Sequence, residues 1–172
     1  MSFGVKVVST EDVATSVKTS PAVRFANVTW ARFWSSTVKS LVMTLWGIFR
    51  SPLMMGGEMR ENDEFTLSLL QNRELIDMLK NSSGARQFKR EETDGKGEII
   101  WTSHGENCKF VALFNTDDEE REISFDITDI SIGGVKYSVR DMWAHEEYTV
   151  TDSEFSAKVN SHGARLFKIT VK

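Results

Sequence analysis

The feature that most constrains the fold of this 172-residue chain is a change of hydrophobic period near residue 82. Before it, apolar residues recur three and four positions apart, as on one side of an α-helix. After it, apolar and polar residues alternate in short runs separated by turn sequences, as in antiparallel strands. The chain is therefore expected to be α+β, with helices first and an antiparallel β domain second.

The first helical segment is expected to end in a short buried strand. Ser35 or Ser36 can cap the helix, and Pro52 ends it because proline has no backbone donor. Residues 53–55 then form a strand without polar alternation, which is typical of a sheet covered on both faces, as in an α/β barrel. The apolar positions of the helix are Trp30, Phe33, Trp34, Val38, Leu41, Val42, Leu45, Trp46 and Phe49.

A second helical segment and a set of strands are expected after this unit. Gly56–Gly57 ends the strand, Asn62 or Asp63 caps the next helix, and apolar residues continue over 65–79. The sequence Asn81–Gly84 is expected to be a loop and the domain boundary. Strands are expected at 99–101, 110–114, 122–127, 136–139, 155–159 and 165–171.

Three segments carry a resemblance to a known family. Residues 45–60 (LWGIFRSPLMMGGEMR), 64–72 (EFTLSLLQN) and 139–145 (VRDMWAH) resemble α-galactosidase-type glycoside hydrolases, the melibiase family, which includes α-N-acetylgalactosaminidases. Residues 161–168 (SHGARLFK) resemble the closing strand of that family. The resemblance covers residues 36–172 and implies a (β/α)8 barrel followed by a small antiparallel β domain.

The resemblance implies a division of the chain into three parts. Residues 1–28 are unassigned. Residues 29–82 are expected to be a remnant of the last βα units of the (β/α)8 barrel. Residues 83–172 are expected to be a C-terminal antiparallel, sandwich-like β domain.

The resemblance implies that the enzymes of this family hydrolyse glycosides with retention of the anomeric configuration. One aspartate is the nucleophile and a second is the acid/base, and the two carboxyl groups lie about 5 Å apart. In the family these come from the fourth and sixth strands, whereas the match here begins beside the eighth. The chain has no Lys-x-Asp segment after a buried strand and no Asp-x-Asp-Met segment. No catalytic, substrate-binding, cofactor-binding or metal residue is therefore assigned, and no cofactor is expected.

The function expected from the resemblance is that of a C-terminal fragment of an α-galactosidase-like retaining glycosidase. It would support the barrel in the full enzyme and have no activity alone, because a barrel needs about 200 residues or more to close. Two alternatives stay open. The chain is a free-standing carbohydrate-binding β module, or it is one half of a split glycosidase that needs a partner chain.

Three clusters of potential ligands or catalytic groups each have a simpler interpretation. Asp117–Glu120 is an acidic run between two expected strands, which indicates a solvated turn rather than a metal site. His104 and Cys108 are four positions apart, but without further ligands they do not make a zinc site. His145–Glu147 has the residues of a general base pair, yet its place in an expected turn disfavours that role.

Four further residues near these segments have structural and functional interpretations. Arg140 and Asp141 are expected to form a local ion pair beside Trp143. Arg50 and Arg60 flank the expected barrel strand. Arg60 is at the end where barrel active sites open, which suits a supporting role in a complete enzyme.

The tryptophans Trp101 and Trp143 suit either a sugar-stacking platform or the interior. An aromatic face matches the apolar side of a pyranose, which favours the first use. Packing in the β core or at the domain interface is the more common use of such residues, and it is the expectation here.

Composition excludes several other classes. The net charge of −4, with scattered basic residues, does not suit nucleic-acid binding. Cys108 is the only cysteine, so no intrachain disulfide forms, and its apolar neighbours indicate an inert core thiol.

Residues 1–20 do not have a secretory signal pattern, and the apolar window 41–59 is interrupted by Arg50 and Pro52. No membrane partner is expected, and the cytoplasm is the default compartment.

The apolar faces of the barrel remnant lead to an expectation about partners. If the neighbouring barrel strands are absent, these faces are exposed and favour self-association or binding of an upstream barrel fragment. A carbohydrate is the other expected partner. The faces are those of Trp46, Phe49, Leu53, Met54 and Phe65.

Overall fold

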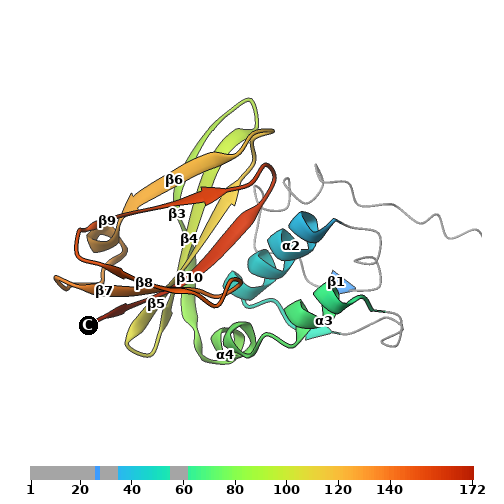
Figure 1. Ribbon diagram of the computed structural model, residues 1–172, viewed down its shortest axis with the longest axis horizontal. Coiled ribbons are helices and arrows are strands. Elements are labelled where there is room, and N and C mark those ends of the chain that lie inside the picture. The colour runs from blue at the N-terminus through green and yellow to red at the C-terminus, as the bar shows by residue number, and fades with distance from the viewer. Residues whose placement is uncertain (1–25, 28–34, 55–61) are drawn as a thin grey trace, which may run out of the picture.

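A computed structural model describes residues 26–27, 35–54 and 62–172 (Figure 1). The expectations for residues 1–25, for Trp30 to Trp34, for Gly56–Gly57 and for Arg60 lie outside these residues. The first part contains β1 (Ala26–Asn27), α2 (Ser36–Ile48), β2 (Leu53–Met54), α3 (Glu64–Leu70) and α4 (Arg73–Asn81). The second contains β3 (Ser83–Thr93), β4 (Lys96–Gly105), β5 (Cys108–Asn115), β6 (Arg121–Asp126), the 3-10 helix η3 (Ile127–Ile130), β7 (Tyr137–Asp141), β8 (Glu147–Val150), β9 (Glu154–Val159) and β10 (Ala164–Val171).

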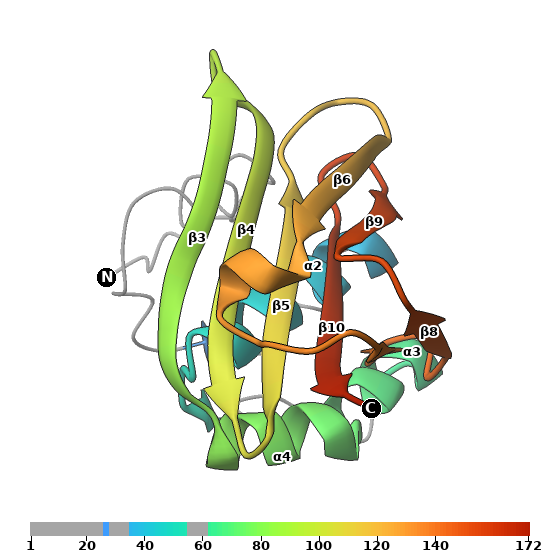
Figure 2. The ribbon, with the colours of Figure 1, turned by 90° about the vertical axis from the view of Figure 1, so that its left-hand side faces the viewer.

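A six-stranded antiparallel sheet is the centre of the described structure. Its strand order is β3-β4-β5-β10-β7-β8. The paired strands β6 and β9 cover one face together with η3, and α2 with α4 covers the other (Figures 1 and 2). This is the expected α+β arrangement, with the helices packed directly on the β domain.

The central strand β5 shows how both faces are filled. All eight of its residues are buried. Phe110, Ala112 and Phe114 belong to the core shared with the helices, whereas Val111 and Leu113 belong to the core under β6 and β9. Because successive side chains of a strand point to opposite faces, a strand covered on both sides is apolar throughout.

Helix α2 is bounded by the expected start signal and by a tight C-terminal turn. The Ser35 side chain accepts a hydrogen bond from the Val38 N–H at 3.4 Å, which confirms the predicted cap. At the other end Arg50 adopts a φ of 56°, its N–H donates to the Gly47 carbonyl, and the Ser51 N–H donates to that of Trp46. This is a Schellman motif with arginine in the position that usually holds glycine.

The expectation that the apolar face of the barrel remnant is exposed is wrong for most of its described side chains. Trp46 is only 7% exposed, and Phe49 and Leu53 pack on the same core. The reason is that α2 lies against β4, β5 and β10, so the sheet of the β domain covers it. Phe65 on α3, at 39%, is exposed as expected.

The helical residues expected over 65–79 form two separately capped helices. Asp63 caps α3, because its Oδ1 accepts from the Thr66 N–H at 2.7 Å. Asn72 caps α4, because its Oδ1 accepts from the Leu75 N–H at 3.2 Å.

The loop expected at Asn81–Gly84 is not present, since only Ser82 separates α4 from β3. The strands β3 and β8 were not expected either. The two residues of β1 lie in the segment left unassigned by sequence, and they pair with β2 in parallel, so that α2 connects two parallel strands. The division into domains stays a prediction. Within the described ranges, no helix combines the length and apolarity that crossing a membrane requires.

Candidate functional site

A buried carboxylate organises the turn that follows β7. Asp141 has no solvent exposure, and its Oδ1 accepts hydrogen bonds from the N–H groups of Trp143 at 2.8 Å and Ala144 at 2.9 Å. Its Oδ2 accepts from Arg165, with Nε at 2.8 Å and Nη2 as a second donor. A buried carboxylate is stable only when paired in this way. The turn is therefore held to β10 by a charged pair.

The ion pair expected between Arg140 and Asp141 is wrong. Arg140 instead makes a bidentate pair with Glu74 of α4, through Nε and Nη2, both at 2.8 Å. Adjacent residues of a strand point to opposite faces, so the two side chains of this sequence pair diverge. The Arg140 hydrogen bonds hold the pKa of Glu74 below its ordinary value.

The general base pair considered for His145–Glu147 does not form. The Nδ1 of His145 lies 2.8 Å from Glu74 Oε1, and its carbonyl accepts from Arg140 Nη1 at 3.0 Å. Glu146 bonds to the hydroxyl of Tyr148, and Glu147 bonds to Ser138 and Lys172. The three side chains thus serve separate contacts of the β7–β8 hairpin.

Both tryptophans pack at the interface between the helices and the sheet, as expected. Trp143 is half-buried, and its Nε1 donates to Oγ1 of Thr44 at 2.8 Å. Trp101 meets the ring of Phe49 edge to face, with centroids 4.2 Å apart. Among the described residues, the buried Nε1 of Trp101 has no hydrogen-bond partner, which suits packing at this interface rather than a sugar platform.

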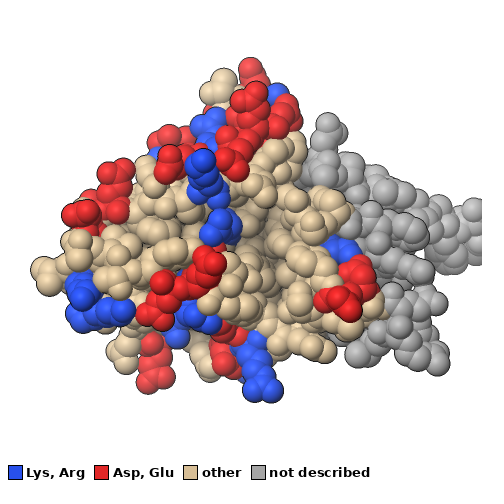
Figure 3. Space-filling view, in the orientation of Figure 1, with Lys and Arg blue, Asp and Glu red and all other residues tan. Residues whose placement is uncertain are grey.

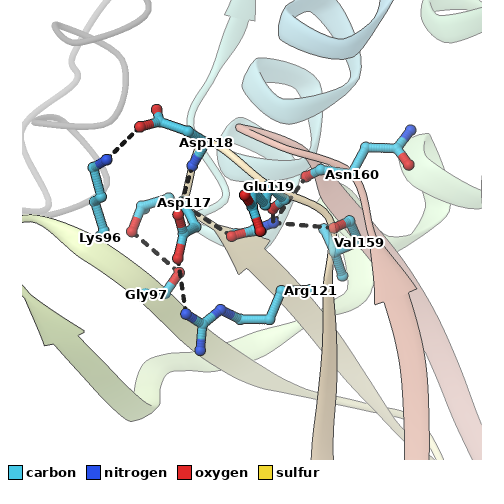
Figure 4. Close-up of polar contacts among 10 residues, drawn as sticks. Lys96, Gly97, Asp117, Asp118, Glu119, Arg121, Val159 and Asn160 are labelled. Atoms are coloured by element: carbon cyan, nitrogen blue, oxygen red, sulfur yellow. Dashed lines mark hydrogen bonds and ion pairs between the residues drawn. The ribbon is translucent and has the colours of Figure 1, made fainter.

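The acidic run at Asp117–Glu120 is more structured than the solvated turn that its composition predicts (Figure 4). Asp117 pairs with Arg121 at 2.8 Å. Asp118 pairs with Lys96 and lies 2.9 Å from His162 Nε2. Asn115 donates from its amide to the carbonyl of Glu119 at 2.7 Å. Arg121 and the backbone N–H of Asp118 lower the pKa of Asp117, whereas Lys96 and His162 lower the pKa of Asp118, so both aspartates have partners within the fold.

His104 and Cys108 do not come together as ligands. His104 Nδ1 lies 2.7 Å from the ammonium of Lys109, and burial raises the pKa of the Cys108 thiol. The residues that the structure describes hold no group of three or more His, Cys, Asp or Glu side chains suited to a metal ion. Arg50 donates from Nε to the carbonyl of Leu79 at 3.2 Å and so joins the end of α2 to α4.

A buried lysine is a structural residue that sequence reasoning missed. Lys39 is 6% exposed, and its ammonium lies 2.5 Å from Asp63 Oδ2 and 2.8 Å from Thr66 Oγ1. Hydrogen bonding from Lys39, and then from the Thr66 backbone, lowers the pKa of Asp63 to about 2. The signal in the sequence was a lysine three positions before Val42, inside the apolar segment of the expected helix.

A hollow of about 270 Å³ lies between the start of α2, Phe65 of α3 and the β9–β10 turn. Phe65 and Trp143 supply aromatic surface, and Lys158 and Arg165 supply positive charge. Among the described residues that line it there is no carboxylate. The hollow therefore does not have the pair of acids that glycoside hydrolysis requires.

Comparison with known proteins identifies the β domain. Residues 95–169 match the family described as the α-galactosidase C-terminal beta sandwich domain. α-Galactosidase D of Emericella nidulans is 28% identical over 129 residues, which are 73% of this chain and 19% of that protein. The α-galactosidase of Cyamopsis tetragonoloba is 25% identical over 128 residues, which are 74% of this chain and 31% of that protein.

Solved structures agree with this similarity. The wild-type GH27 β-L-arabinopyranosidase of Geobacillus stearothermophilus is 37% identical, with a TM-score of 0.73 over 80% of this chain and 31% of that chain. α-Galactosidase I of Mortierella vinacea, at 19% identity and a TM-score of 0.70, shares the fold over 81% of this chain and 36% of that chain. The chain thus spans about a fifth to a third of the curated relatives' length.

Proposed function

We propose that the β domain of this chain holds the last βα unit of the barrel in place, because the chain corresponds to the C-terminal portion of an α-galactosidase-like glycosidase. In this proposal α2 and β2 belong to the barrel wall, and the β domain fixes their position. In this proposal the two catalytic carboxylates come from other strands of the barrel, because no acid of this chain matches the family's catalytic segments.

The observation that carries this proposal is the set of bonds between the helical unit and the β domain. Trp143 reaches Thr44 in α2, and Asn72 Nδ2 donates to the carbonyl of Met142 at 2.7 Å. Glu74 pairs with Arg140 of β7. These contacts join the two parts at three points around one shared hydrophobic core, which suits a rigid support.

The pairing of three described aspartates with cations suits the same division of labour. A retaining glycosidase holds its two carboxylates about 5 Å apart across the anomeric carbon. In the described residues, Asp63, Asp117 and Asp141 each pair with a Lys or Arg, and none lines the hollow. The chain alone is therefore proposed to be inactive.

The relatives suggest a substrate class for the complete enzyme. They are α-galactosidases and a β-L-arabinopyranosidase. α-D-Galactopyranose and β-L-arabinopyranose share the configuration of their ring hydroxyls, and they differ in that arabinopyranose has no hydroxymethyl group. We propose that the complete enzyme cleaves terminal pyranosides of galacto configuration.

A chimera tests the proposal. The barrel of the Geobacillus β-L-arabinopyranosidase, cut before its last βα unit, is joined to this chain at Ser35 and assayed on p-nitrophenyl α-D-galactopyranoside and β-L-arabinopyranoside. We expect turnover of at least one substrate by the chimera, and none by this chain or by the truncated barrel alone. Turnover by the pure chain, or a folded chimera without activity, contradicts the proposal.

A further inference from the structure

The hollow beside α2 has the form of a small binding site. Its volume of about 270 Å³ is close to the lower end of the range for small-molecule pockets, about 300 Å³, and suits a single ring. Figure 3 shows the surface recessed near the centre of the view, with basic side chains at its edge and acidic side chains next to them. It is open to solvent on one side, which gives a ligand access.

The walls of the hollow include two aromatic side chains from different elements. Phe65 of α3 is 39% exposed, one of the few large apolar residues at the described surface. Trp143 is fixed by its bond to Thr44, so its ring needs no ordering when a ligand binds. Fixed aromatic rings provide flat apolar area at little entropic cost, and the C–H face of a pyranose packs on such surfaces.

The polar lining of the hollow favours an anion. Lys158 is 71% exposed and forms an ion pair with Glu120 at 3.6 Å, an exposed and therefore weak contact with which a ligand carboxylate can compete. Arg165 lies deeper, where the carboxylate of Asp141 is fully buried behind it. Asn160 also lines the hollow. A site with cationic donors and no carboxylate complements a ligand that carries its own negative charge.

We propose that this hollow is a non-catalytic subsite for an acidic pyranose, a uronate whose ring packs on Phe65 and Trp143 and whose carboxylate meets Lys158. None of the residues that line the hollow is assigned to hydrolysis, although α2 and Trp143 also take part in the proposed support of the barrel. It gives the β domain a means of holding an acidic polysaccharide.

Titration of the whole chain with three small probes tests the proposal. Sodium galacturonate, galactose and sodium acetate are added while the indole N–H signal of Trp143, assigned with Trp143→Phe, is followed by NMR. We expect saturable shifts with galacturonate at a dissociation constant on the order of 1 mM, as for other ligands of this size. Galactose and acetate should each bind at least about threefold more weakly, because galactose has the ring without the carboxylate and acetate has the carboxylate without the ring.

Two variants that each remove one positive charge distinguish binding at the hollow from nonspecific electrostatic attraction. Lys158→Gln is expected to weaken galacturonate binding about threefold to tenfold, the range for one exposed charge-assisted contact. Lys80→Gln, on an exposed residue of α4 outside the hollow, is the matched control and should change nothing. Phe65→Ala should weaken galacturonate and galactose alike. Equal binding of all three probes, no saturable shift, or equal effects of the two lysine variants would overturn the proposal.

Discussion

The indole Nε1 of Trp143 donates a 2.8 Å hydrogen bond to Oγ1 of Thr44, across 99 positions of sequence. Thr44 has no solvent exposure and in turn donates to the carbonyl of Ser40 at 2.7 Å. The bond therefore joins the turn after β7 to the middle of α2. It is the most direct polar link between the β domain and the helix that we assign to the barrel wall.

Replacing Trp143 by Phe is expected to lower the free energy of unfolding by about 1–2 kcal/mol, because Thr44 loses its donor while most ring packing is kept. A double-mutant cycle with Thr44→Val measures the coupling in urea denaturation. We expect about 1 kcal/mol of coupling, since the residues are in direct contact. Additive single effects would show that the bond contributes nothing to stability.

Replacing Asp141 by Asn is expected to destabilise the fold by about 3 kcal/mol. The amide still accepts from the turn backbone, but it presents no charge to Arg165, whose cation then stays without its partner. Thermal and urea unfolding measure the loss. The exposed Asp152→Asn is the control and should stay within about 0.5 kcal/mol of the parent. Equal effects of the two substitutions would mean that the charge of Asp141 is unimportant.

The Lys39–Asp63 pair predicts a specific acid sensitivity. The pKa of Asp63 is lowered from an ordinary 3.8 to about 2, mainly by its hydrogen bond with Lys39. A carboxyl whose pKa is depressed by folding adds stability above the unfolded pKa, and this is lost as the pH falls toward the folded pKa. The stability difference between the parent and Asp63→Asn should therefore shrink between pH 5 and pH 2.

This pH experiment has an internal control. Asp77→Asn, at an exposed position of α4, is measured over the same range as the matched control for the loss of one carboxylate. Direct titration of the Asp63 carboxyl by NMR provides the second measurement. A midpoint close to 3.8 would contradict the assigned pair.

Replacing Gly47 by Ala tests how closely α2 and α4 approach. A Cβ at this position would lie 2.5 Å from Leu75 Cδ1 and 2.9 Å from Met78 Cε, in a fully packed core. Overpacking of about 1–3 kcal/mol should outweigh the helix propensity gained, about 1 kcal/mol. Gly133→Ala is the control, because nothing lies within 4 Å of the place its Cβ would take. A more stable Gly47→Ala variant would show that the two helices separate easily.

Local signals predicted much of the fold. The caps Ser35 and Asp63, the end of α2 before Pro52, and the change from helices to strands all depend on residues close in sequence. The strands β3 and β8 were missed because neither has the alternating pattern of a half-buried strand. They are the two edges of the sheet, where only one neighbour and little core contact are required.

The sequence by itself determined the order of elements, the family resemblance and the packing of both tryptophans against the core, because periodicity and capping act between near neighbours. Only the tertiary structure decided that Arg140 meets Glu74 rather than Asp141, and that the sheet covers Trp46. Ion pairs and docked faces depend on which distant segments the folded backbone brings within a few ångströms. Residue spacing along the chain does not carry that information.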